Sequence, residues 1–231
     1  MKAVLMSGGK GVRLRPFTYV QPKPLLPVGP MCPVEYSFRY LKEFGVEEII
    51  ISINYLKEKF NICNEFSKKY NIPVRLVEED QEMGTIGSLY LMKDMLDKPF
   101  IMLNGDLISE PPYKSMLSYF EEENATLLIG VKQHHEISQY GVIKFNKDGK
   151  FSEIVEKPKR KDWISTGIYI IDPSVINLMR GLPMDTPDLI KLLSERHKPI
   201  LTYDIGEKWL DIGNLDDYDR AYGLIKRWQR S

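Results

Sequence analysis

The sequence predicts an α/β protein, with a Rossmann-like mixed, mostly parallel sheet flanked by helices and a smaller β-rich part. Short β-rich runs alternate with amphipathic helical segments over the first half of the chain, which is typical of a parallel, doubly wound sheet. From residue 125 the pattern changes to hairpin-like strands. The length of 231 residues, 43% of them hydrophobic, suffices for one large domain (1–231) with a sizeable core.

The first half supplies the alternation. Strands are expected where short β-rich runs stand, at Ala3–Met6, Glu48–Ile53, Val74–Val77 and Pro99–Leu103. Helices are expected between them and after them, at Val34–Phe44, Lys57–Tyr70, Ser88–Met95 and Tyr113–Glu122. These elements predict the parallel part of the sheet.

The second half supplies a hairpin and the closing elements. Gly141–Phe145 and Phe151–Val155 flank the turn Asn146-Lys147-Asp148-Gly149 and predict two antiparallel strands. Closing elements are expected as helices at Pro173–Met179, Pro187–Arg196 and Asp216–Trp228, with a strand at Ile200–Ile205. Acidic residues in the first turn of the last helix suit the positive end of its dipole.

Composition points to a soluble, cytoplasmic protein. Cys32 and Cys63 lack metal-ligand spacing, so reduced thiols are expected rather than a disulfide or zinc site. The N-terminal apolar run is too short for a leader peptide, and no stretch approaches the roughly 20 apolar residues of a membrane span. His134 and His135 have no further zinc ligands nearby and are interpreted as loop residues.

The N-terminal segment predicts a phosphate site. Five basic residues and no acid precede Glu35, in a chain whose formal net charge is zero. Three glycines, Gly8, Gly9 and Gly11, follow the first strand and let backbone N–H groups approach anionic oxygens. Arg13 offers a planar fork to phosphate, and Lys23 stands between two prolines, which predict a stiff, extended segment.

Two common phosphate loops are excluded. A P-loop needs a glycine followed by Lys and Ser or Thr, whereas Gly11 is followed by Val12 and Arg13. A dinucleotide fingerprint needs a third glycine, which is missing after Gly11.

The chain resembles the sugar-phosphate nucleotidyltransferases over nearly its whole length. The resemblance begins with two N-terminal motifs, Gly8-Gly9-Lys10-Gly11-Val12-Arg13-Leu14-Arg15-Pro16-Phe17-Thr18 and Pro22-Lys23-Pro24-Leu25-Leu26-Pro27-Val28. It continues in family order through Gly84-Thr85-Ile86-Gly87-Ser88-Leu89, Asn104-Gly105-Asp106, Tyr140-Gly141-Val142, Glu156-Lys157-Pro158, Thr166-Gly167-Ile168-Tyr169 and Trp209-Leu210-Asp211-Ile212-Gly213. It implies a nucleotide-binding part (1–124) and a sugar-binding part with closing helices (125–231), in the short form that lacks a β-helix domain.

The resemblance implies four catalytic residues, Arg13, Lys23, Asp106 and Asp211. Arg13 is expected to stabilise the leaving pyrophosphate and Lys23 the region of the α-phosphate. Asp106 follows a strand at the sheet edge where α/β folds bind ligands, although such an aspartate alone often caps a turn. Asp106 and Asp211 together are expected to hold Mg²⁺, which prefers oxygen ligands.

Nucleotide and sugar contacts follow from the same resemblance. The nucleotide is expected to contact Leu5, Ser7, Gly8, Gly9, Lys10, Gly11, Val12, Arg13, Lys23, Gln81, Gly84, Thr85, Gly105 and Asp106. The sugar phosphate is expected to contact Asn104, Tyr140, Gly141, Glu156, Lys157, Ser165, Thr166 and Gly167. In this assignment Glu156 accepts hydrogen bonds from sugar hydroxyls, Lys157 pairs with the attacking phosphate, and the β-rich part forms the sugar-facing wall.

The sequence is compatible with several substrates. Three positions depart from the family pattern. Ser7 stands where the family usually has Ala, Val12 where it often has Thr or Ser, and Ser165 where related members often have Asn. The motifs around Gly84 and Asp106 favour a guanylyl- or uridylyltransferase over the thymidylyl branch. The expected partners are a nucleoside triphosphate and the 1-phosphate of a hexose, hexosamine or heptose, without nucleic acid or membrane, and a homo-oligomer is left open. A phosphocholine-type cytidylyltransferase and a non-catalytic nucleotide-sugar-binding regulator are the alternatives.

Overall fold

The computed structural model describes residues 1–181 and 183–228. A seven-stranded sheet forms the centre, in the order β10-β6-β9-β4-β1-β2-β3. Its strands are β1 Lys2–Met6, β2 Glu48–Ile53, β3 Val74–Glu78, β4 Phe100–Asn104, β6 Leu127–Ile137, β9 Lys159–Ile171 and β10 Ile200–Asp204. Strand β9 runs antiparallel to both its neighbours and the other pairs are parallel, which confirms the predicted mixed, mostly parallel sheet.

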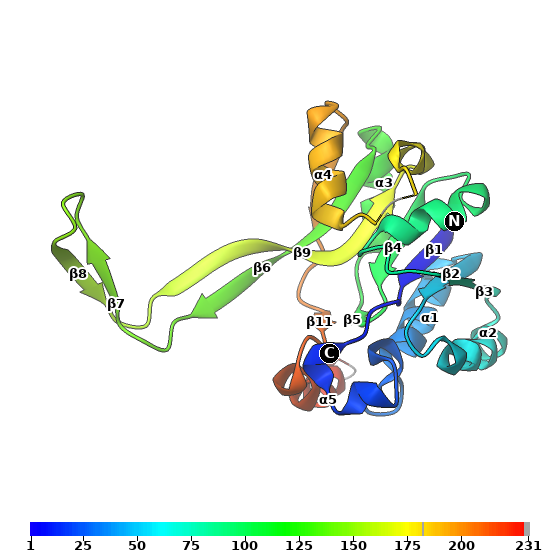
Figure 1. Cartoon of the computed structure of the whole chain (residues 1–231), viewed down its shortest axis with the longest axis horizontal. Helices are drawn as coiled ribbons and strands as arrows, with labels where there is room; N and C mark the ends of the chain where they lie inside the picture. Colours follow the sequence, from blue (N-terminus) through cyan, green and yellow to red (C-terminus); the bar gives the residue numbers. More distant parts are fainter. Residues whose placement is uncertain (182, 229–231) are drawn as a thin grey trace.

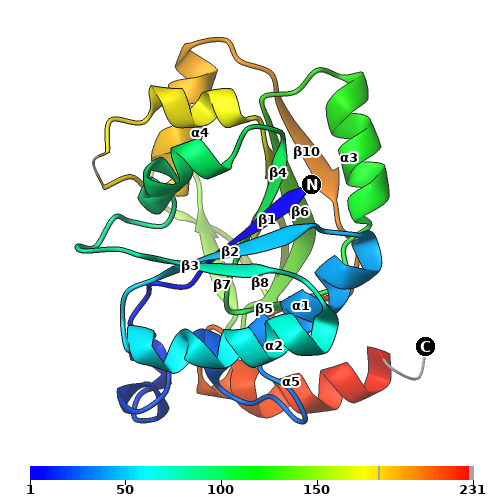
Figure 2. The same cartoon turned by 90° about the vertical axis from the view of Figure 1, so that its right-hand side faces the viewer.

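Helices cover both faces of this sheet (Figures 1 and 2). One face packs on α1 Pro33–Phe44, α2 Cys63–Tyr70 and α3 Tyr113–Glu122. The other packs on η5 Gly87–Met95, η6 Pro173–Leu178 and α4 Thr186–Glu195. Side chains alternate along β1 and pack into the cores on both faces of the sheet. Ala3 and Leu5 lie in the core beside α1, α2 and α3, and Val4 lies in the core beside η5, η6 and α4. No helix in the described parts of the chain is both long and apolar enough to cross a bilayer.

Three predicted α-helices form differently. Residues 57–70 divide into a 3₁₀ segment, η4 Lys57–Ile62, followed by α2, and this tight turn buries Phe60 completely. The predicted helices at 88–95 and 173–179 are the 3₁₀ segments η5 and η6. Hydrophobic spacing does not separate three residues per turn from 3.6 over so few residues, so the type of turn was not predictable.

A third layer lies below the sheet edge. Strands β5 Leu107–Ser109 and β11 Trp209–Asp211 pair antiparallel, and α5 Leu215–Trp228 packs against them. Short 3₁₀ turns, η1 Val12–Leu14, η2 Phe17–Tyr19 and η3 Lys23–Leu25, complete this layer. It brings the N-terminal loops and the C-terminal helix to the same place, as the blue and red ribbons show in Figure 1.

The distal halves of β6 and β9 leave the body as a two-stranded ribbon. The ribbon ends in a hairpin of β7 Val142–Phe145 and β8 Phe151–Val155, both at the expected positions. His134 and His135 lie on β6 within this ribbon, so they are strand residues and not loop residues as expected. The proximal residues of β6, in contrast, are buried in the main sheet.

Cys32 and Cys63 are free and buried. Burial raises the pKa of both thiols to about 12.

Candidate active site

The glycine loop after β1 forms one wall of a cavity of about 530 Å³. Gly11 has a left-handed backbone (φ 59°), and a Cβ there would lie 3.0 Å from side-chain atoms of both Thr18 and Lys23. Thr18 Oγ1 donates a hydrogen bond to the carbonyl of Gly11 and holds the turn. Only glycine fits this position without strain. The cavity is lined by Met6, Ser7, Gly8, Gly9, Lys10, Gly11, Val12, Arg13, Lys23, Pro24, Glu79, Glu82, Met83, Gly84, Thr85, Asn104, Asp106 and Gly213.

Lys23 reaches the cavity from a 3₁₀ turn, and not from the extended segment that its prolines predicted. Leu25 N donates to the carbonyl of Pro22 and Leu26 N to that of Lys23, so the turn does not need the N–H that Pro24 lacks. The turn buries the Lys23 side chain, of which about a tenth is exposed.

Two distant aspartates converge on the Lys23 ammonium group. Its Nζ lies 2.5 Å from Asp106 Oδ2 and 3.4 Å from Asp211 Oδ1. The ladder between β5 and β11 explains the meeting, because Asp211 pairs with Leu107, the neighbour of Asp106. Burial and the charge of Asp106 raise the pKa of Asp211, against the opposing charges of Lys23 and Arg13.

A hard cation fits this pair of carboxylates. Asp106 Oδ1 and Ser7 Oγ are buried, and neither makes a hydrogen bond within the described chain. A buried carboxylate oxygen without a donor is costly unless a cation or water satisfies it. Gly105 makes room for this arrangement, because a Cβ there would lie 2.1 Å from Ser7 Oγ. No group of three or more metal-ligating side chains occurs among the described residues, so further ligands would come from substrate oxygens or water.

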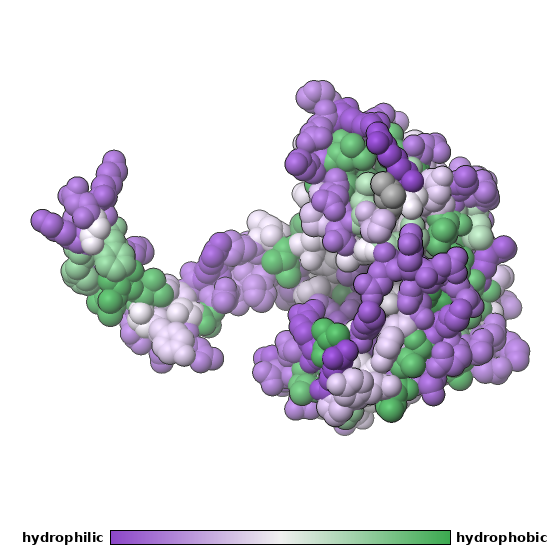
Figure 3. Space-filling model, viewed as in Figure 1, coloured by the Kyte–Doolittle hydropathy of each residue, from purple (hydrophilic) through white to green (hydrophobic). Residues whose placement is uncertain are grey.

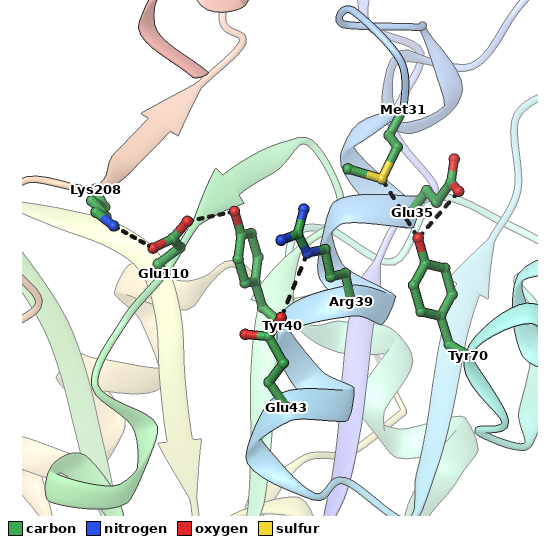
Figure 4. Close-up of polar contacts among 8 residues, drawn as sticks. All are labelled: Met31, Glu35, Arg39, Tyr40, Glu43, Tyr70, Glu110 and Lys208. Atoms are coloured by element: carbon green, nitrogen blue, oxygen red, sulfur yellow. Dashed lines mark hydrogen bonds and ion pairs between the residues drawn. The ribbon is translucent and has the colours of Figure 1, made fainter. Parts of the chain in front are cut away.

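A polar network fixes the far end of the β5–β11 pair (Figure 4). Lys208 Nζ lies 2.7 Å from Glu110 Oε2, and the hydroxyl of Tyr40 on α1 donates to Glu110 Oε1 at 2.6 Å. Burial would raise the pKa of Glu110, but the hydrogen bonds from Lys208 and Tyr40 outweigh it and lower that pKa. The network thus ties β5, which follows Asp106, and β11, which carries Asp211, to helix α1.

The opposite end of the cavity is formed by residues 79–85. Gly84 is left-handed (φ 75°), and a Cβ there would lie 2.6 Å from the carbonyl oxygen of Met184. Thr85 N donates to Asp185 Oδ1 at 2.8 Å, which anchors this loop to the start of α4. Gly84 and Thr85, two of the expected nucleotide contacts, line the cavity.

Two acidic residues of this wall were not predicted. Glu79 accepts a hydrogen bond from Ser52 Oγ at 2.5 Å and lies so close to Gly8 that a Cβ there would be 3.0 Å from its Oε1. Glu82 forms an ion pair with Lys10. Met6, Pro24, Met83 and Gly213 also line the cavity without having been predicted. The position of Glu79 just after β3, at the carboxyl end of a parallel strand, was a signal that could have found it.

The sugar-side candidates divide into two groups. Asn104 lines the cavity, and Gly167 (φ 75°) lies so close that a Cβ there would be 2.5 Å from Asn104 Nδ2. Thr166 is buried, donates to the carbonyl of Gly130, and accepts a hydrogen bond from Trp209 Nε1 at its own carbonyl. Ser165 lies at the root of the projecting ribbon, where its hydroxyl is 2.8 Å from that of Tyr169.

The second group lies away from the cavity. Tyr140, Gly141, Glu156 and Lys157 lie at the far end of the ribbon, so the structure does not place the expected sugar-facing wall beside this cavity. Continuous pairing of β6 and β9 as far as Ile137 and Lys159 carries these residues outward.

Three of the expected nucleotide contacts, Leu5, Gln81 and Gly105, are not among the residues that line the cavity. The Leu5 side chain is fully buried in the core, because alternation along β1 points it into the sheet packing. Gln81 is exposed and does not line the cavity, because the following residues from Glu82 onward form the wall. Gly105 is buried, and its backbone N–H donates to the carbonyl of Met6.

Comparison with known proteins identifies relatives over almost the whole chain. The family model described as nucleotidyl transferase matches residues 2–226. The chain is 32% identical to a mannose-1-phosphate guanyltransferase of Schizosaccharomyces pombe, over 94% of this chain and 62% of that protein. It is 33% identical to mannose-1-phosphate guanylyltransferase 1 of Arabidopsis thaliana, over 94% of this chain and 63% of that protein. The chain therefore spans somewhat less than two thirds of the length of these curated relatives.

Solved structures show the same fold. The crystal structure of HddC from Yersinia pseudotuberculosis superposes with a TM-score of 0.75 and 24% identity, covering 97% of this chain and 99% of that one. A second structure of the same protein, complexed with GMP-PN, gives a TM-score of 0.74 with the same identity and coverage.

Proposed function

Because the chain belongs to the nucleotidyl transferase family, we propose that it transfers a nucleotidyl group from a nucleoside triphosphate to a sugar 1-phosphate. The products are a nucleoside-diphosphate sugar and pyrophosphate. The observation that carries the proposal is the convergence of Asp106 and Asp211 on Lys23. Lys23 and Asp106 line the cavity that the glycine loop also lines.

The proposed reaction needs positioning and charge neutralisation. A phosphate oxygen of the sugar 1-phosphate attacks the α-phosphorus in line, and the bond from that phosphorus to the pyrophosphate oxygen breaks. The nucleophile is already an anion, so no general base is required. Preorganised cations and N–H groups then account for most of the rate enhancement.

The cationic residues take separate roles in this proposal. Backbone N–H groups of the loop Gly8–Gly11 hold the triphosphate, and Arg13, which lines the same cavity, stabilises the leaving pyrophosphate. Lys23 neutralises the α-phosphate region. Its ammonium group is already oriented by two carboxylates, so little reorganisation is needed when the substrate binds.

Mg²⁺ is the proposed cofactor, held by Asp106 and Asp211. The buried, unpartnered Asp106 Oδ1 supports this assignment. When bound, the ion would supply positive charge to the oxygens of the transferred phosphate.

Guanine is the proposed base, with uracil as the second choice. The curated relatives named above are mannose-1-phosphate guanylyltransferases, and a relative of the same fold was crystallised with GMP-PN. Glu79 adds a chemical argument, because it presents a carboxylate at the cavity wall beside Gly8. Guanine carries two adjacent donors, N1–H and the 2-amino group, which one carboxylate can accept together.

The sugar phosphate is proposed to bind beside Asn104, with Thr166 and Gly167 at the floor. Glu156 and Lys157 remain the proposed contacts to the sugar hydroxyls and to the attacking phosphate.

A pyrophosphate-release assay tests the function. The four ribonucleoside triphosphates are each combined with phosphocholine and with the 1-phosphates of mannose, heptose, glucosamine and glucose, with Mg²⁺ and with excess EDTA. We expect Mg²⁺-dependent release that is greatest with GTP and requires a sugar 1-phosphate. Release only with CTP and phosphocholine would instead support a cytidylyltransferase, and nucleotide-sugar binding without any release would support a non-catalytic regulator.

A further inference from the structure

The projecting ribbon and its hairpin form one unit, residues 132–165, which we call the arm. It contains the distal parts of β6 and β9 together with β7 and β8. Figure 1 shows the arm standing away from the body, and Figure 3 shows open space between the hairpin and the body. All residues of β7, and all of β8 except the half-buried Val155, are exposed.

The hairpin has one strongly apolar face. Ile143 pairs with Ile154 and Phe145 with Phe151, and paired residues lie on the same side of a ladder. These four residues are 50%, 61%, 67% and 64% exposed, respectively, and Figure 3 shows green, apolar surface on the hairpin beside its purple, polar end. The opposite face carries an ion pair between Lys144 and Glu153 and the smaller apolar pair of Val142 and Val155. Such a division is typical of a sheet with one covered face, and a lone hairpin is marginally stable in water.

The body of the same chain does not cover this face. The ladder between β6 and β9 continues without interruption from Val131 and Ser165 out to Ile137 and Lys159. It holds the hairpin outward, so the face is left to another molecule.

Charge identifies that molecule. The arm contains eight basic and five acidic residues, so its formal charge is +3, and the rest of the chain, whose total is zero, carries −3. Contact between two arms would bring like charges together, whereas contact between an arm and a body joins opposite charges. The arm's complement is thus the body of a second copy of this chain. At the cavity the body offers both apolar and acidic groups, because Val12, which is 53% exposed, lines it together with Glu79, Glu82 and Asp106.

Two polar residues at the base of the hairpin also lack partners. Glu156 and Lys157 are exposed, and neither makes a hydrogen bond or ion pair within residues 1–181 and 183–228. Lys157 has a left-handed backbone (φ 43°), a costly conformation for a side chain of this kind. Gly141 leaves room for the Glu156 carboxylate, because a Cβ there would lie 3.0 Å from its Oε2.

We infer that two copies of this chain exchange arms, each seating its hairpin on the other's body and placing Glu156 and Lys157 at the other's cavity. The exchange is reciprocal, so a two-fold axis closes the assembly and leaves no free arm. The placement at the cavity rests on the proposed function, whereas the exchange of arms rests only on the apolar face and the charges.

The assembly is tested first by light scattering on the full chain after gel filtration. We expect a dimer that dissociates in the double variant Phe145→Lys with Phe151→Lys. The matched control, Lys144→Ala with Glu153→Ala on the opposite face, should stay dimeric. A single change, Ile143→Lys, repeats the test, and thermal unfolding confirms that each body is folded. A monomeric wild-type chain, or a dimer that survives both face variants, would overturn the exchange.

The contribution to the site is tested by mixing two defective chains. Asp106→Asn disables the body, and Glu156→Gln with Lys157→Met disables the arm. If arms are exchanged, a mixed dimer contains one site with an intact body and an intact arm. After random exchange of equal amounts, half of the dimers are mixed, so about a quarter of the wild-type activity should return.

The controls distinguish the possible failures. Each variant is carried through the same exchange alone and should stay inactive. Activity of the mixture equal to the average of the two parents would mean that each arm serves its own chain, and an arm variant with wild-type activity would exclude the arm from the site. Wild-type chain without nucleotidyl transfer would refute the proposed function, while the light-scattering result would still decide the exchange.

Discussion

Asp211 lies directly opposite Leu107 in the ladder between β5 and β11, and this pairing brings its carboxylate to the same ammonium group as Asp106. The two aspartates come from opposite halves of the sequence. Their meeting depends on a pair of three-residue strands, and the ion pair between Glu110 and Lys208 holds the other end of that pair.

Removing the Asp106 charge should abolish most catalysis without unfolding the protein. Asp106→Asn keeps the size of the side chain but loses a charge that faces Lys23 at 2.5 Å. We expect kcat to fall roughly 10²-fold or more, the usual effect of losing a transition-state electrostatic contact. Asp94→Asn, an exposed carboxylate outside the cavity, is the control. Near wild-type turnover of Asp106→Asn would refute its catalytic role.

Asp211→Asn should separate activity from stability. Its raised pKa means that the native state binds a proton more tightly than the unfolded state does. The free energy of unfolding therefore falls as the pH rises from the ordinary pKa of 3.8 to the raised pKa of Asp211. Above the raised pKa, the full loss of stability is present.

Asparagine cannot ionise, so this variant should be at least as stable as the wild type near pH 7, while its activity falls strongly. The gain should disappear below the ordinary pKa, where both forms are uncharged. Urea unfolding at the two pH values, with the activity assay, measures both effects. A clear loss of stability confined to neutral pH would contradict the expectation.

Glu110→Ala should weaken the support of the β5–β11 pair. The change leaves the Tyr40 hydroxyl and the Lys208 ammonium group without their acceptor, at a cost of about 1–3 kcal/mol. We expect kcat to fall more than KM changes, because Glu110 positions the strands and does not line the cavity.

Glu110→Gln keeps an acceptor for Tyr40 and should restore part of the loss. The control is Glu43→Ala on α1, the helix that also carries Tyr40. This change breaks the exposed ion pair with Arg39 and should lower the free energy of unfolding by less than about 1 kcal/mol. Equal effects of Glu110→Ala and Glu43→Ala would show that the network has no positioning role.

Glu79→Gln should relax the choice of base. A neutral amide offers one acceptor oxygen and an NH₂ donor where guanine presents two donors. We expect kcat/KM for GTP to fall at least tenfold, with a smaller change for UTP. Inosine triphosphate, which lacks the 2-amino group, should lose less than GTP in the same variant. An equal fall for all three nucleotides would show that Glu79 supports the loop and does not read the base.

Much of the fold followed from local pattern. The strands from β1 to β4 and helices α1 and α3 lie where alternation and helical spacing predicted them, within one residue at either end. The division of residues 57–70 and the 3₁₀ segments could not be predicted in this way. A 3₁₀ helix, with three residues per turn, leaves almost the same hydrophobic pattern as a short α-helix. The glycine loop was recognisable because its chemistry is contained in a few consecutive residues.

The sequence by itself determined the α/β class, the glycine loop and the identity of the charged residues, since each depends on neighbours along the chain. Only the tertiary structure decided that Asp211 lies beside Asp106 and that Glu79 faces Gly8. It also decided that Glu156 and Lys157, between β8 and β9, lie on an arm that stands away from the body. Strand pairing, and the direction in which a long ribbon leaves the sheet, are set by contacts between residues distant in sequence, which no local pattern records.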